Sequence, residues 1–155
     1  MNEMTEKYFK KEFSYMFDDE SKMEPFTLFG FETHEGWNSL LFNLFNIIAI
    51  LDIKKNVRVR QVKTKLASLR FYIDWIGEDK SDQTREKIYE IIDIFETISE
   101  KTCEECGEPG SRRSINHWLW TLCDDCYLAR IYSISAKKEE EEKLLVSGVL
   151  QPEDI

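Results

Sequence analysis

The chain has 155 residues, of which 42% are hydrophobic and 33% charged, and its formal net charge is −9. This length allows one domain with a true core and excludes two full domains, and the apolar content excludes wholesale disorder. The acidic balance argues against general nucleic-acid binding, which draws most of its affinity from phosphate groups.

The sequence predicts a cytoplasmic protein that does not enter a membrane. Its first residues are charged throughout and contain no apolar signal core. The longest apolar stretch, 40–53, is interrupted by Asn43, Asn46 and Asp52 and is too short to cross a bilayer. In a reducing compartment, four cysteines favour metal ligation over disulfide bonds.

Two amphipathic helices are predicted in the first third of the chain. In 4–17, apolar residues recur at helical spacing, and a loop through Pro25 and Gly30 follows. The second helix, 36–53, has a wider apolar face and is the expected centre of the core. The apolar residues of that face are Trp37, Leu40, Leu41, Leu44, Phe45, Ile48 and Leu51.

The pattern then changes to the alternation typical of strands. Apolar and polar residues alternate over 57–60 and again over 69–75, which predicts a β-hairpin with its turn near Ala67-Ser68. The alternation slips between Arg60 and Val62, and this slip indicates a β-bulge.

A third helix, a cysteine-containing segment and a last helix complete the chain. Ser81 is the expected N-cap of the third helix. Its predicted buried stripe consists of Ile88, Ile91, Ile92, Phe95 and Ile98. A short hairpin is expected over 112–122 between two cysteine pairs, and the last helix is expected over 124–145.

These elements predict an α+β fold, in which helices pack on a small antiparallel hairpin or sheet and a zinc-ribbon-like module lies near the C-terminus. The expected organisation is a helical and β-hairpin core over 1–101, a zinc module with a C-terminal helix over 102–146, and a flexible tail over 147–155.

The four cysteines predict one structural zinc site. Cys103 and Cys106 form one CxxC pair, Cys123 and Cys126 form the other, and sixteen residues separate the pairs. Two such knuckles complete a tetrahedron of thiolates, which leaves no open position for catalysis. An iron–sulfur cluster, a redox CxxC pair and ligation by His117 are alternatives, but the spacing favours four-thiolate zinc.

A basic segment, Lys54–Arg70, is the best candidate for a binding surface. It holds seven basic residues and no acidic one, so the other residues carry −16, the difference between −9 and +7. Lys and Arg side chains on paired strands can grip a phosphate or carboxylate. The proposed ligand-binding residues are Trp37, Gln61, Lys63, Lys65, Arg70 and Tyr72. The alternative is a solvated edge strand with Lys as a guard against aggregation, and for Trp37 a place in the core.

Several segments in this order resemble a family of small uncharacterised phage and prophage proteins. The resemblance covers roughly 28–126 and rests on Phe29–Glu32, Gly36-Trp37, Gln61–Lys65, Leu69–Tyr72, Cys103–Gly110 and Trp120–Asp124. The chain departs from the pattern at Thr33-His34, where Cys-Gly is expected, at Leu66–Ser68, where Phe-Gly-Gly is expected, and in its longer last helix. The resemblance implies a mobile-element origin, a zinc knuckle, and action in the cytoplasm of a bacterial host.

Three functions remain open, and the first is favoured. It is a non-enzymatic, zinc-stabilised binding protein that engages a host protein, or sequesters a small phosphorylated ligand such as a nucleotide, to counter host defence. The second is a zinc-ribbon nucleic-acid regulator, against which the −16 counts. The third is a small nucleotide hydrolase using Glu32, His34 or Glu35, but the sequence contains no catalytic motif that supports it. The many Phe and Ile residues also allow a homo-oligomer.

Overall fold

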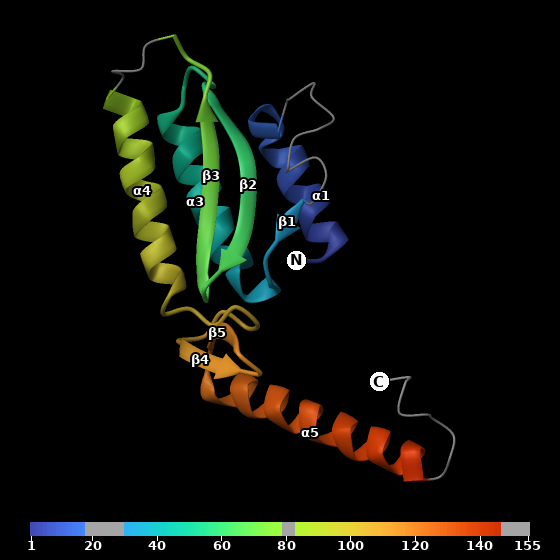
Figure 1. Cartoon of the computed structure of the whole chain (residues 1–155). Helices are drawn as coiled ribbons and strands as arrows, with labels where there is room; N and C mark the ends of the chain where they lie inside the picture. Colours follow the sequence, from blue (N-terminus) through green and yellow to red (C-terminus); the bar gives the residue numbers. More distant parts are fainter. Residues whose placement is uncertain (18–29, 79–82, 147–155) are drawn as a thin grey trace. The chain divides into compact units, whose positions relative to one another are not determined.

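The computed structural model describes residues 1–17, 30–78 and 83–146 (Figure 1). Helices and two small sheets confirm the α+β fold. The chain divides into two compact units, Met1–Cys123 and the part that begins at Asp124, and each is described by itself. This division differs from the expected boundary after residue 101, because the first cysteine pair packs on the preceding fold.

The first unit is built on a three-stranded sheet in the order β1-β2-β3. Strands β2 (Val57–Lys65) and β3 (Ser68–Trp75) form the predicted antiparallel hairpin. Its turn is Leu66-Ala67, slightly earlier than expected, and a register shift between Val59 and Gln61 confirms the bulge. The sequence did not predict β1 (Phe31–Glu32), which pairs parallel to β2.

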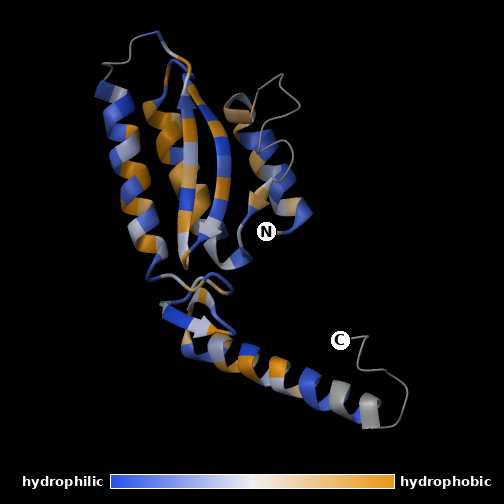
Figure 2. Cartoon of the chain, viewed as in Figure 1, coloured by the Kyte–Doolittle hydropathy of each residue, from blue (hydrophilic) through white to orange (hydrophobic). Residues whose placement is uncertain are grey.

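The apolar sides of the sheet and helices enclose the core. Figure 2 shows the alternation of apolar and polar residues along β2 and β3. The expected first helix is α1 (Glu3–Glu12) followed by the 3-10 turn η1 (Ser14–Phe17). The central helix is η2 (Glu35–Trp37) continued by α3 (Asn38–Leu51). Five of its predicted core residues are buried: Trp37, Leu41, Leu44, Phe45 and Ile48.

Helix α4 (Gln83–Ser99) covers the free edge of β3. The Leu69 N–H donates to Ser99 Oγ at 2.8 Å, and the Phe71 N–H donates to Glu96 Oε1 at 2.9 Å. These side chains satisfy backbone donors that an edge strand otherwise leaves unpaired. The predicted stripe is confirmed for Ile88 and Ile92, both buried. It is wrong for Ile98, which is 43% exposed, because Ser99 and not Ile98 faces the edge of β3 at this end of the helix.

The cysteine segment contains the predicted hairpin, formed by β4 (Ser111–Ile115) and β5 (Trp118–Leu122). The second unit begins with α5 (Asp124–Val146), in agreement with the predicted last helix. In the described ranges, none of the helices has the length and apolar character that crossing a membrane requires. The expected loop through Pro25, the Ser81 cap and the 147–155 tail lie outside the described residues.

Replacing the edge-covering hydroxyl tests this packing. We expect Ser99→Ala to lower the free energy of unfolding by about 2 kcal/mol, because the buried Leu69 N–H loses its acceptor. Thr97→Ala is the matched control, since Thr97 is exposed on the same helix. Urea denaturation followed by circular dichroism measures both variants, and equal effects would contradict this role for Ser99.

Candidate metal centre and adjoining groove

The four cysteines come together as one potential metal centre. Their Sγ atoms all lie within 4.8 Å of one another, and the Sγ atoms of Cys106 and Cys123 are 3.6 Å apart. Sulfurs placed about 2.3 Å from a central ion at tetrahedral angles are about 3.8 Å apart, so the observed group fits such an ion. The cysteines form no disulfides. The group can therefore hold a metal ion, whereas His117 lies in the turn between β4 and β5 and is not part of it.

Cys103 is the buried member of the group. Burial alone raises the pKa of its thiol, but backbone N–H groups of Cys123, Cys106 and Glu105 point at the sulfur and, together with the Cys106 side chain, lower the pKa overall. Backbone donors of this kind stabilise a thiolate, which is the form that binds metal.

The first knuckle, Cys103–Gly107, packs directly on the backbone of Gly36. The Gly36 N–H donates to the carbonyl oxygen of Glu104 at 2.9 Å. A Cβ at Gly36 would lie 2.6 Å from the Gly107 nitrogen and 2.7 Å from the Cys106 nitrogen, and it would collide with the Cys103 carbonyl. Gly107 itself has φ of +84°, a conformation that favours glycine. Only glycine fits at position 36.

Trp37 belongs to the core and has no role in ligand stacking here. Its side chain has no exposed surface, and its indole Nε1–H donates to the Thr102 carbonyl at 2.8 Å. A ring without an exposed face cannot stack on a ligand, so the proposal of Trp37 as a ligand-binding residue is wrong and its alternative, a core position, holds. The indole instead joins the central helix to the start of the cysteine segment.

A buried chain of hydrogen bonds continues from the knuckle to the β2–β3 turn. The Glu104 N–H donates to the Thr121 carbonyl at 2.9 Å, and the Thr121 N–H donates to Glu104 Oε1 at 2.8 Å. The Thr121 hydroxyl donates to the Ala67 carbonyl at 2.7 Å. Glu104 and Thr121 have no exposed surface, so these bonds fix the tip of the hairpin against β5.

Two arginines of the basic segment pair with acidic residues outside it. Arg60 Nε lies 3.0 Å from Asp74 Oδ2, and an Arg70 guanidinium nitrogen lies 3.1 Å from Glu96 Oε2. Arg58 donates to the backbone carbonyls of Lys55 and Val57. Two of the seven basic residues of the segment are thus paired with acidic side chains outside it.

The proposed hairpin residues do share one face. The register pairs Gln61 with Tyr72 and Lys63 with Arg70, and Lys63 Nζ lies 5.7 Å from the Tyr72 ring centroid. Gln61 Nε2 donates to Glu32 Oε2 at 2.9 Å, on the neighbouring strand β1. Lys65 is exposed at the end of β2. The structure therefore brings together the proposed residues of the hairpin, but Arg70 is held by Glu96.

A groove of about 470 Å³ lies between β1–β2 and the cysteine segment, and we call it the tryptophan groove. It is lined by Phe31, Glu32, Thr33, His34, Lys63, Thr64, Glu104, Trp118 and Trp120. The sequence indicated Glu32, His34 and Lys63 as site candidates but not the two tryptophans. Their i, i+2 spacing on a strand was the available signal, since such residues point to one face.

The His34 ring closes one side of the tryptophan groove. Its centroid lies 5.1 Å from that of Trp120, and its Nδ1 is 3.6 Å from Glu105 Oε1. These contacts hold the imidazole against the hairpin of the cysteine segment. Glu35, the other acidic candidate in this region, instead accepts a hydrogen bond from Asn2 Nδ2.

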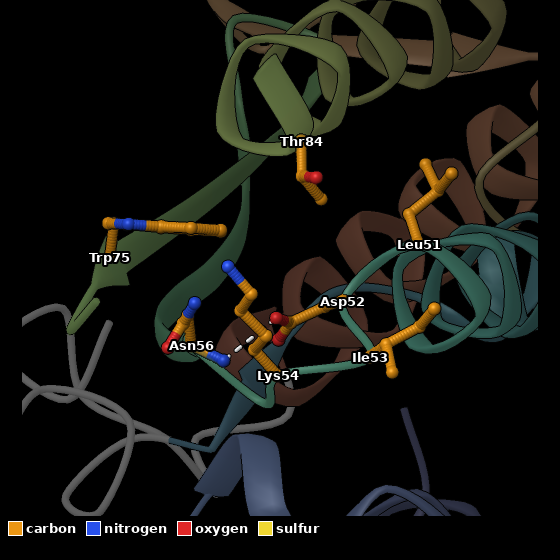
Figure 3. A pocket seen from close by; sticks show the side chains of 7 residues that line it. All are labelled: Leu51, Asp52, Ile53, Lys54, Asn56, Trp75 and Thr84. Carbon is orange, nitrogen blue, oxygen red and sulfur yellow. Dashed lines mark hydrogen bonds between the residues drawn. The ribbon is translucent and has the colours of Figure 1, made fainter. Parts of the chain in front are cut away.

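A smaller cavity, of about 150 Å³, lies at the end of α3 (Figure 3). Its carboxylate, Asp52, accepts hydrogen bonds from the backbone N–H groups of Asn56 and Val57, both at 2.8 Å. Burial and the nearby charge of Asp52 raise the pKa of the Tyr15 phenol. Asp52 thus serves to hold the turn between α3 and β2.

The close approach at Gly36 can be tested by adding one methyl group. We expect Gly36→Ala to lower the free energy of unfolding by about 3 kcal/mol or more, because rigid backbone surrounds the new Cβ. Gly77→Ala is the control, since the atoms nearest its Cβ belong to the side chains of Trp75 and Asn56, which can move. Thermal unfolding of the two variants measures the difference, and a Gly36→Ala protein as stable as the control would refute the packing described here.

Comparison of the chain with protein-family models, with curated proteins and with solved structures finds no match. A function can therefore be inferred only from the chemistry of the cysteine group and of the tryptophan groove.

Proposed function

We propose that the chain is a zinc-stabilised binding module that engages a partner through the tryptophan groove. Zinc is the preferred ion because four thiolates in two CxxC knuckles match its tetrahedral demand. Four protein ligands leave no coordination position for substrate, which supports a structural metal.

The observation that carries the binding function is the tryptophan groove itself. Its volume of about 470 Å³ falls within the range of roughly 300–1,000 Å³ that is typical of ligand sites. Its walls combine aromatic rings with a few charged and hydroxyl groups, as recognition sites do.

Binding is favoured over hydrolysis because the carboxylates of the groove already have structural partners. Glu32 accepts from Gln61, and Glu104 accepts from the Thr121 N–H. A mobile-element origin, which the resemblance implies, and action against host defence are both predictions.

Zinc is tested by native mass spectrometry of protein purified without chelator. We expect one zinc ion per chain, and we expect Cys103→Ser or Cys123→Ser to lose the ion and unfold the cysteine segment, because each removes one thiolate. Ser133→Ala in α5 is the control, since Ser133 is exposed. A folded, metal-free wild-type protein would remove the structural metal from the proposal.

Binding at the groove is tested by nuclear magnetic resonance of the indole N–H groups. Three probes represent the candidate partners: a blocked Gly-Arg-Gly peptide, adenosine triphosphate, and a short single-stranded oligothymidine. We expect at least one probe to shift the indole resonances of Trp118 and Trp120 at millimolar concentration, and we expect the shift of Trp120 to require a higher probe concentration in Trp118→Ala. If none of the probes perturbs these resonances, the groove is not the binding site.

A further inference from the structure

We propose that the tryptophan groove receives an arginine side chain from a basic segment of a partner protein. This inference rests on the proposed binding function and names the chemistry of the partner. It follows from the aromatic walls, the balance of charge in the groove, and a second cavity that continues from the first.

The aromatic walls suit a flat cation. Trp118 and Trp120 lie two residues apart on β5 and both line the groove, and Trp118 is 63% exposed. The His34 ring packs against Trp120. A cation over the face of an indole is attracted by the partial negative charge of that face, which comes from the ring quadrupole, and a guanidinium also stacks on it as a plane.

The charges of the groove favour a cation over a phosphate. Its lining holds two carboxylates, Glu32 and Glu104, against the single ammonium of Lys63. Glu105 adds a third carboxylate beside His34. Glu104 has no exposed surface and acts on a ligand only through its charge, whereas Glu32 is exposed. A phosphate would have to approach these acidic groups, whose charge repels it.

Within the groove, Lys63 is the cation that would repel an arginine side chain, and its position reduces this repulsion. It is the register partner of Glu32 on the neighbouring strand, and its Nζ lies 5.7 Å from the Tyr72 ring centroid. The Tyr72 ring therefore partly stabilises the charge of Lys63 before any ligand arrives. The net charge of −9 for the whole chain likewise attracts a basic partner.

Two buried hydroxyls in the groove wall add capacity for hydrogen bonds. Thr33 is 5% exposed, and within the described part of the chain neither Thr33 Oγ1 nor Thr64 Oγ1 has a hydrogen-bond partner. Buried polar groups are nearly always hydrogen-bonded, and these two hydroxyls lie beneath the groove surface, so only a ligand group that enters the wall would satisfy them.

A second cavity makes the site longer than one side chain. It has a volume of about 300 Å³ and shares Thr64 and Trp118 with the tryptophan groove. Its other lining residues are Lys65, Leu66, His117 and Leu119. Adjacent cavities that share one exposed tryptophan fit successive residues of a peptide segment better than one compact small molecule.

The test compares the blocked Gly-Arg-Gly peptide with its citrulline analogue, which keeps the shape of arginine and lacks the charge. Titration followed by the indole resonances of Trp118 and Trp120 should show tighter binding of the arginine peptide, by about fivefold or more. Equal affinity of the two peptides would overturn the proposal, because no charge would then be recognised.

Three variants identify the site. Trp118→Ala should weaken arginine binding by about fivefold or more, while Trp118→Phe keeps a ring and should retain most of the affinity. Tyr132→Ala, which removes an exposed ring from α5, is the control that should change nothing. Trp118→Ala and Trp118→Phe proteins that bind equally well would overturn the role of the aromatic wall.

Lys63→Gln best distinguishes a cationic from an anionic ligand, because the expected change in affinity has the opposite sign for the two. It should tighten binding of the arginine peptide and leave the citrulline peptide unchanged, whereas it would weaken binding of adenosine triphosphate. If adenosine triphosphate or the oligothymidine binds the groove and the arginine peptide does not, the arginine proposal fails and the binding function stands. If all three fail to bind, both fail.

Discussion

The backbone of the first cysteine knuckle lies so close to Gly36 that no side chain fits between them, and much of the first unit depends on this contact. The Gly36 N–H bonds to the Glu104 carbonyl, and the neighbouring indole of Trp37 bonds to Thr102. The same knuckle residue, Glu104, pairs with Thr121 on β5. These contacts join the cysteine segment to the sheet and the central helix, and the first compact unit extends through Cys123.

This packing explains why the surface between the sheet and the cysteine segment is well formed. Thr33 and His34 immediately precede the knuckle contact, and Glu104 lies within the knuckle. A metal bound by the four cysteines would hold the floor of the tryptophan groove without contacting a ligand there. The binding energy of a structural zinc ion adds directly to the stability of the fold that holds it.

Sequence patterns predicted the elements well because each carried a local signal. The alternation along 57–60 and 69–75 identified the hairpin and its bulge, and the CxxC spacing identified the cysteine group. Strand β1 was missed because two residues are too few to show a period. Ile98 was misplaced because the edge of β3 requires a hydroxyl at Ser99, which is a tertiary demand.

The candidate site was less predictable, because the order of charged residues in a sequence does not show which of them lie close together in the fold. Arg60 and Arg70 are balanced by Asp74 and Glu96, the latter far along the chain. Trp118 and Trp120 become site candidates only in the fold, where residues of β5 and β2 line the same groove. Spatial neighbours of this kind follow from topology, and a single sequence gives no direct measure of them.

Both hairpins turn through residues that are not glycine. Leu66 and Ala67 have φ of 55° and 63°, and Asn116 and His117 have φ of 49° and 65°. Two-residue hairpins usually place Asn-Gly or Gly-Gly there, since positive φ strains other residues. Glycine at 66 or 117 would relax the backbone but would remove a side chain that lines the second cavity. Directed evolution for thermostability alone would therefore tend to introduce glycine at these two turns, whereas selection for ligand recognition would retain Leu66 and His117.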